Sequence, residues 1–186
     1  PSASDTIDYF TIASAGNATD FGNLVSARKL VGGLSSSTRT LIGGGGYPSA
    51  VNSIDYVTTA TTGNAQDFGD LTIGRGIAAG LSSATRGLVG TGQVSPATTS
   101  ASIDAISITS GGNAFDFGDC TIARYGRGST TDCIRGVFAG GNGPALTNIL
   151  DYVNISTFGD AVDFGDIHNV SARIEGGCST GHGGLG

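Results

Sequence analysis

The sequence predicts an all-β protein made of four repeated units. Phe21, Phe68, Phe117 and Phe164 each stand within Asp-Phe-Gly, at intervals of 47, 49 and 47 residues. An Ile-Asp-Tyr tripeptide or a close variant recurs in step, at 7–9, 54–56, 103–105 and 150–152. Glu and Lys, which favour helix, occur once each, whereas Val, Ile, Thr, Tyr and Phe supply most of the bulk. A fixed period of this length indicates a repeat architecture built from strands.

The second unit shows how a repeat is built. The small apolar run 75–83 and the run 85–92, which ends in Gly, predict two short buried strands. The alternating run 102–110 predicts a third strand, and "FDFGD" at 115–119 predicts a short outer fourth strand. The intervening Gly and Asn residues tolerate the positive φ of a tight turn. Four strands in a repeat of this length are typical of one β-propeller blade.

The predicted fold is therefore a single-domain β-propeller of about four four-stranded blades. Three blades are continuous in the sequence, at roughly 25–72, 73–120 and 121–167. The fourth combines 168–186 with 1–24, and the pairing of these N- and C-terminal strands closes the ring and removes open sheet edges. A larger ring formed by two chains together is the alternative.

These repeats resemble kelch repeats, whose blades carry a Gly pair after the second strand and a Tyr in the third. The Gly-rich segments lie at 42–46, 89–92 and 139–143, and the Tyr residues are Tyr9, Tyr56 and Tyr152. The four Phe match the aromatic of the fourth strand, which is usually Trp in kelch blades. Arg28, Arg75, Arg124 and Arg173 match the Arg that often precedes the first strand. The chain departs from the pattern in lacking Trp and in having Ala105 at one Tyr position.

The recurring Phe and Arg residues are predicted to hold the blades together. Phe21, Phe68, Phe117 and Phe164 are expected to fill the gaps between blades. Arg28, Arg75, Arg124 and Arg173 are expected to form salt bridges with Asp between blades, because buried Arg is normally paired. The alternative is a ring of Arg around a central opening that binds an anion.

The Asp-Phe-Gly tripeptide has no kinase context, because the chain contains neither His-Arg-Asp nor a helical lobe pattern. We expect each Asp to cap a turn by accepting backbone N–H groups, and each Gly to adopt a conformation that other residues resist. Calcium bound by Asp67 with Asp70, or by Asp116 with Asp119, is the alternative. No Asp-x-Asp-x-Asp-Gly loop supports that alternative.

No constellation in the sequence predicts catalysis, a metal or a cofactor. His168 and His182 have no nucleophile elbow around them, and Cys120, Cys133 and Cys178 form no zinc spacing. Cys120 occupies a position that is Leu or Ile in the other copies, so it is predicted to be a small buried hydrophobe. The net charge of −6 argues against nucleic-acid binding, and no apolar run reaches the length of about 20 residues that spans a bilayer. No signal peptide is expected from the N-terminal residues.

Function is predicted to reside in the loops after the second strands, which differ most between copies. The candidate interaction residues are Tyr47, Pro48, Val94, Pro96, Pro144 and Leu146.

The amino-acid sequence of the repeats resembles that of repeat proteins of tailed bacteriophages, especially those that infect marine cyanobacteria. This resemblance is carried by "SIDYVTTATTGNAQDFGDLT" at 53–72, "ATRGLVGTG" at 84–92 and the terminal "GHGGLG". The resemblance implies a non-enzymatic component of the extracellular virion: a tail, fibre or capsid-surface protein that contacts other virion proteins or further copies of itself. The alternative is an adhesin for a host receptor or a host surface glycan.

Overall fold

The structure is a computed structural model that describes residues 2–46, 49–95, 98–171 and 177. The elements in these ranges are all strands, and no helix suited to crossing a membrane occurs in them. The strands are β1 (Ser4–Tyr9), β2 (Thr19–Arg28), β3 (Gly32–Ser35), β4 (Arg39–Gly43), β5 (Ser53–Thr58), β6 (Gln66–Asp70), β7 (Ala79–Ser82), β8 (Arg86–Ser95), β9 (Thr98–Ser107), β10 (Phe115–Asp119), β11 (Gly128–Thr131), β12 (Arg135–Ala139), β13 (Thr147–Asn154) and β14 (Val162–Ser171).

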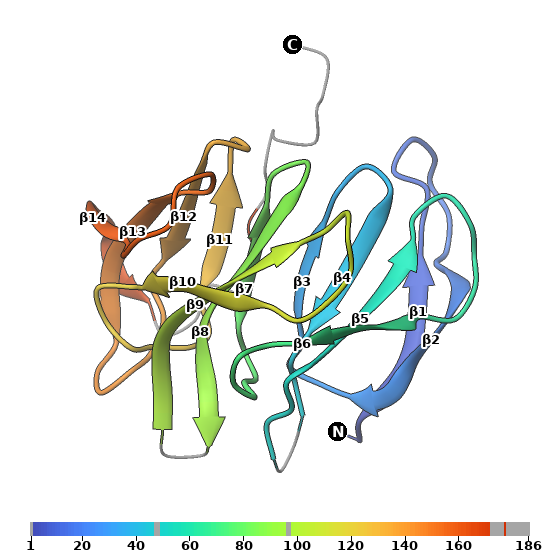
Figure 1. Cartoon of the computed structure of the whole chain (residues 1–186), viewed down its shortest axis with the longest axis horizontal. Coiled ribbons are helices and arrows are strands. Elements are labelled where there is room, and N and C mark those ends of the chain that lie inside the picture. The colour runs from blue at the N-terminus through green and yellow to red at the C-terminus, as the bar shows by residue number, and fades with distance from the viewer. Residues whose placement is uncertain (1, 47–48, 96–97, 172–176, 178–186) are drawn as a thin grey trace.

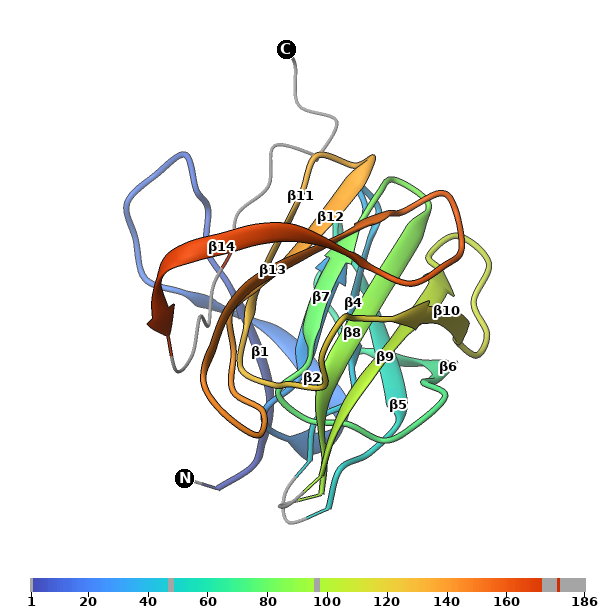
Figure 2. The same cartoon turned by 90° about the vertical axis from the view of Figure 1, so that its left-hand side faces the viewer.

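The strands form small antiparallel sheets, each built from neighbours in the sequence. Three sheets have four strands, in the orders β3-β4-β5-β6, β7-β8-β9-β10 and β11-β12-β13-β14, and β1 pairs with β2 in a two-stranded sheet. The sheets stand in a row, with β1 and β2 at one end and β14 at the other (Figure 1). Figure 2 shows the same row from its β14 end. The prediction of an all-β protein is confirmed, and the arrangement is propeller-like.

The first strands of the sheets are the ones that lie closest together. The Ser82 hydroxyl of β7 donates to the Ser35 carbonyl of β3 at 2.6 Å, and the Ser129 hydroxyl of β11 donates to the Gly80 carbonyl at 2.7 Å. A β-carbon added at Gly80 would collide with the Gly33 carbonyl. Small residues therefore let the first strands approach one another, as the innermost strands of propeller blades must.

The apolar core lies between neighbouring sheets rather than inside any one of them. Leu88 and Val89 are successive residues of β8, so their side chains point to opposite faces of the sheet. Leu88 belongs to a buried cluster shared with the β11–β14 sheet, and Val89 to one shared with the β3–β6 sheet. The middle sheet is therefore covered on both faces, whereas each end of the row leaves a face with no neighbouring sheet in the described part of the chain.

The hairpin of β8 and β9 is longer than the sequence predicts. Gln93 pairs with Thr99 and Ser95 with Thr98, so both strands extend well past the Gly residues that were expected to end the second strand. Val94 therefore lies within β8 and is half-buried, and its assignment to a loop was wrong. Gln93 and Ser95 continue the ladder opposite Thr99 and Thr98, and Thr suits a strand on a half-exposed surface.

Closure of the ring by the terminal strands lies largely outside the described residues. Within the described ranges β1 pairs only with β2, and the blade expected from 168–186 and 1–24 includes 172–176 and 178–186, which are not described. Gly177 is described, and a β-carbon added there would collide with the Ser129 carbonyl of β11. Gly177 thus approaches β11 as Gly80 approaches β3.

Each Phe of Asp-Phe-Gly sits at a β-bulge in the fourth strand. Asp67 pairs with Asp55 and Gly69 with Ile54, so Phe68 is an extra residue without a partner on β5. Such a bulge turns a side chain away from the regular alternation. Phe68 is 6% exposed and packs edge-on against Tyr56 with ring centroids 5.7 Å apart. The bulge thereby directs the ring into the core between sheets.

The four Phe rings are not equivalent. Phe68 and Phe117 are buried, Phe21 is half-buried, and Phe164 is 53% exposed. The expectation of four similarly buried rings was therefore wrong for Phe21 and Phe164. Phe164 lies on β14 at the end of the row, where no described sheet follows to cover it.

We predict that replacing the most buried of these rings, Phe117, destabilises the protein more than replacing the most exposed one, Phe164. Phe117→Ala should lower the free energy of unfolding by about 3–5 kcal/mol, because it removes a buried ring and leaves a cavity. Phe164→Ala should lower it by about 1 kcal/mol or less, because half of that ring is already in water. Urea unfolding of the two variants in dilute protein measures both changes, and equal losses would contradict the burial difference.

Candidate functional site

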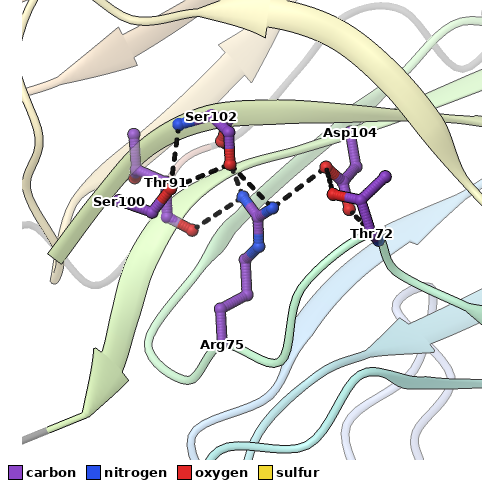
Figure 3. A network of polar contacts seen from close by, with 6 residues as sticks. All are labelled: Thr72, Arg75, Thr91, Ser100, Ser102 and Asp104. Atoms are coloured by element: carbon purple, nitrogen blue, oxygen red, sulfur yellow. Dashed lines mark hydrogen bonds and ion pairs between the residues drawn. The ribbon is translucent and has the colours of Figure 1, made fainter. Parts of the chain in front are cut away.

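The first recurring polar site surrounds the buried guanidinium of Arg75 (Figure 3). One of its nitrogens donates to the Asp104 carboxylate at 2.9 Å and to the Ser102 hydroxyl at 2.9 Å. The other donates to the Ser102 carbonyl at 2.6 Å and to the Thr91 carbonyl at 3.3 Å. Burial lowers the pKa of Arg75, and the Asp104 carboxylate opposes this effect. The charge is thus compensated inside the protein.

The Asp104 carboxylate also holds the chain as it arrives from the preceding sheet. It accepts the Thr72 N–H at 2.8 Å and the Thr72 hydroxyl at 2.7 Å. Asp151 accepts the same two groups of Thr121, at 3.3 and 2.5 Å. Each carboxylate therefore fixes the segment that leads into its own sheet.

Equivalent ion pairs join Arg28 to Asp55 at 3.1 Å and Arg124 to Asp151 at 2.7 Å. All three arginines bind a carboxylate on the third strand of the sheet that they precede. They were expected to pair between blades. This holds for Arg28, the last residue of β2, whose Asp55 lies on β5 of the next sheet. It is wrong for Arg75 and Arg124, which lie in the connection that leads into the sheet carrying their own Asp. The alternative of an open anion-binding ring is also wrong for these three, since their side chains are buried. Arg173 lies outside the described residues.

The second recurring site joins neighbouring sheets through a turn. Between β9 and β10, Gly112 and Ala114 donate N–H groups to the Phe68 and Asp70 carbonyls of β6, at 2.9 and 2.7 Å. The Asn113 side-chain oxygen accepts the Asp70 N–H at 3.1 Å. The same three bonds run from residues 63–65 to β2 and from residues 159–161 to β10. We call 63–65, 112–114 and 159–161 the junction turns.

The Gly of Asp-Phe-Gly is required by this contact. Gly69 has a φ of +142°, and a β-carbon there would lie 2.6 Å from the Gly112 carbonyl oxygen. Gly118 has a φ of +143°, with its β-carbon position 2.5 Å from the Gly159 carbonyl oxygen. The backbone conformation and the close approach of the next turn both exclude larger residues. This explains why the Gly of the tripeptide recurs.

A second series of arginines reinforces each junction. Arg39 of β4 donates to the Ile108 carbonyl of the next sheet at 3.0 Å, and Arg86 of β8 donates to the Ile155 carbonyl at 2.9 Å. Both isoleucines are buried. Arg135 holds the same place on β12, where it is exposed and its guanidinium lies 5.9 Å from the centre of the Tyr152 ring.

The Asp of Asp-Phe-Gly does not act as the sequence suggested. Asp67 and Asp116 are exposed and make no side-chain hydrogen bond within the described residues; only Asp163 accepts a backbone N–H, that of Gly165 at 2.9 Å. The turn-capping role predicted for Asp67 is therefore wrong. The acceptor that each junction needs comes instead from the junction turn of the next sheet. No group of three or more His, Cys, Asp or Glu placed to hold a metal ion occurs in the described ranges.

Arg127 is a buried charge that the sequence analysis missed. Its guanidinium lies 4.6 Å from the centre of the Phe138 ring, and one nitrogen lies 3.5 Å from the Cys120 sulfur. Its Nε and Nη1 find no hydrogen-bond partner among the described residues. Burial lowers the pKa of Arg127. Burial also raises the pKa of the Cys120 thiol, and the nearby Arg127 charge opposes that rise. Cys120 lies in the core, as predicted.

The candidate interaction loops are described only in part. Pro144 and Leu146 lie in the connection between β12 and β13, and both are exposed. Tyr47, Pro48 and Pro96 lie outside the described residues. His168 is an exposed residue of β14, and His182 also lies outside them.

No protein-family model matches the chain, and no curated protein matches it by sequence. A solved structure of a protein called YjhT is similar, with a TM-score of 0.69 and 8% sequence identity. The similarity covers 82% of this chain and 56% of that one, so the chain spans little more than half the length of its neighbour. At this identity the likeness shows the fold alone, which is β-propeller-like.

We predict that Asp104→Ala lowers the free energy of unfolding by about 3–5 kcal/mol, because it leaves the buried Arg75 charge without its carboxylate. Asp67→Ala is the matched control. It should change stability by no more than about 0.5 kcal/mol, since Asp67 is exposed and has no polar partner in the described residues. Thermal melts of both variants, with and without a calcium chelator, measure these effects. A chelator-dependent loss at Asp67 would instead support calcium binding.

We also predict that the Cys120 thiol resists alkylation in the folded protein. Its raised pKa keeps the thiolate population below that of an unfolded cysteine at the same pH. The folded state therefore loses stability as the pH rises above the ordinary thiol value, because only the unfolded chain then releases this proton. Mass spectrometry of the Cys120 peptide after iodoacetamide treatment, with and without urea, checks this. Equal labelling in both conditions would contradict the prediction.

Proposed function

We propose that this protein is a non-enzymatic structural module that functions by contacting other proteins. The observation that carries the proposal is that most of the recurring arginines in the described residues are used inside the fold. The arginines that precede the first strands bind buried carboxylates, and a second series, Arg39 and Arg86, binds carbonyls of the next sheet. Exposed apolar side chains that a protein partner could cover remain on β2, β14 and the β12–β13 loop, at Val25, Phe164 and Leu146.

The sheets are proposed to be blades of a propeller ring. In that ring, the residues that follow β14 are proposed to supply the first two strands of the last blade, and β1 and β2 are its third and fourth strands. The placement of Gly177 beside β11 supports this arrangement, because Gly80 of β7 approaches β3 in the same way.

The setting we propose is a bacteriophage virion, where the protein is a tail, fibre or capsid-surface component in contact with other virion proteins. The resemblance of its repeats to those of tailed bacteriophages supports this setting. Closed β-structure with few long charged side chains also suits an extracellular particle, because it exposes few sheet edges.

We predict that the protein is present in purified particles at a constant copy number. Quantitative mass spectrometry of gradient-purified virions, with major capsid peptides as the internal reference, tests this, and antibody labelling in electron microscopy locates it. Absence from the particle would defeat the virion proposal.

A hydrolase screen and a glycan array on the purified protein separate the alternatives. We expect neither turnover nor saturable binding. Turnover would overturn the non-enzymatic proposal, and saturable glycan binding would favour an adhesin.

A further inference from the structure

The two ends of the row carry complementary halves of the contact that joins the sheets. The hairpin between β1 and β2 contains Gly16-Asn17-Ala18, which corresponds to the junction turns, and all three residues are exposed. At the other end, β14 carries Phe164-Gly165-Asp166, which corresponds to the strand that receives a junction turn. A β-carbon added at Gly165 would have nothing within 4 Å, whereas one added at Gly22, Gly69 or Gly118 would collide with a junction turn. Gly16 and Ala18 make none of the backbone bonds to described residues that the junction turns make. Neither half is therefore occupied by a described residue of the same chain.

The second contact of each junction is also split between the two ends. Arg135 holds the position of Arg39 and Arg86, whose guanidinium groups bind the Ile108 and Ile155 carbonyls. Ile12 holds the position of those isoleucines but is 93% exposed, whereas they are at most 1% exposed. A partner that brings a turn like 16–18 onto β14 would also bring an isoleucine like Ile12 to Arg135.

The curvature of the row argues that one chain does not bring its own ends together. β1 and β2 lie at the end of the row opposite to β14 (Figure 1). The likeness to the propeller-like YjhT covers 82% of this chain but only 56% of that one, so a propeller of that length contains nearly as much protein again as this chain matches. A second copy supplies that amount, and it carries the same two complementary ends.

We propose that two copies of this chain associate head to tail. The turn 16–18 of each copy docks on β14 of the partner, so that two identical junctions close one ring. Gly16 and Ala18 donate N–H groups to the carbonyls of Phe164 and Asp166 of the partner subunit, and the Asn17 side-chain oxygen accepts the N–H of Asp166 of the partner subunit. The inference rests on the propeller arrangement in the proposed function and names a second copy as the source of the missing strands. Contacts of this heterologous kind form closed rings when the rotation between copies permits it.

The test is the mass of the purified chain and of two variants, Ala18→Arg and Ala13→Arg. Sedimentation velocity measures this mass over a range of concentrations. Ala18 is exposed here, whereas its counterparts Ala65 and Ala161 are 8% exposed inside junctions. Ala18→Arg should therefore raise the dimer Kd at least about 25-fold, the change that corresponds to losing about 2 kcal/mol at an interface hot spot. Ala13→Arg is the control, because its counterparts Ala60, Thr109 and Ser156 are all exposed.

The wild-type chain and Ala13→Arg should sediment as dimers, and Ala18→Arg as a monomer with an unchanged circular dichroism spectrum. Arg135→Ala provides a second variant on the opposite end, and it should also weaken the dimer. A wild-type monomer at all concentrations would overturn the proposal, as would a dimer that tolerates Ala18→Arg. Protection of the Gly16 and Ala18 amides from hydrogen exchange in a monomer would show closure within one chain instead. These outcomes are independent of particle composition, so a dimer absent from virions would count against the proposed function alone.

Discussion

Each sheet of this protein depends on the next one to cover its apolar face and to complete the hydrogen bonds of its outer strand. The dependence is visible at β6, where the Phe68 and Asp70 carbonyls are satisfied by the turn of the following sheet. A small sheet gains stability by covering its hydrophobic face, and the buried clusters here lie between sheets, so the energy of folding comes largely from burial between sheets. A buried ring such as Phe117 therefore stabilises two sheets at once, and the ends of the row are where this support stops.

The buried charges set the position of each sheet rather than supplying most of the stability. A buried ion pair recovers in attraction roughly what it loses in hydration, so its value lies in the arrangement that it enforces. Asp104 accepts bonds both from Thr72 and from Arg75, so it fixes where the chain enters the sheet. Arg39 and Arg86 then connect each sheet to the next through backbone carbonyls. Together these contacts fix both the entry and the angle of each repeat.

The sequence was sufficient to predict the strands, because periodic apolar runs and Gly-rich turns are local signals. It also placed Cys120 in the core from its alignment with Leu and Ile of other copies. It assigned the turn-capping role to Asp67 rather than to Asn113 of the next turn, although both recur with the same period. Recurrence alone does not say which neighbour a polar group contacts. That knowledge requires the packing of sheets that lie dozens of residues apart.

The exposure of Phe164 was beyond sequence reasoning for a related reason. Phe117 and Phe164 have the same local sequence, Asp-Phe-Gly-Asp, and differ only in whether another sheet follows. Likewise, the sequence predicts a loop at Val94, because the residues that extend β8 and β9 are polar and show no apolar alternation. The Arg127 site carried no signal at all, since no other repeat has an arginine at that position.

One aromatic contact makes the order of the repeats matter. Ala105 leaves a gap where the other sheets place Tyr beside the bulged Phe, and Phe158 of the following sheet packs against Phe117 instead, with ring centroids 5.4 Å apart. Arg86 lies over this same Phe158 ring. A gene rearrangement that exchanged two repeats would preserve every hydrogen-bonded junction and yet separate Ala105 from Phe158. Such a shuffled protein would carry an unfilled void beside Phe117, so this pair of side chains restricts recombination among the repeats.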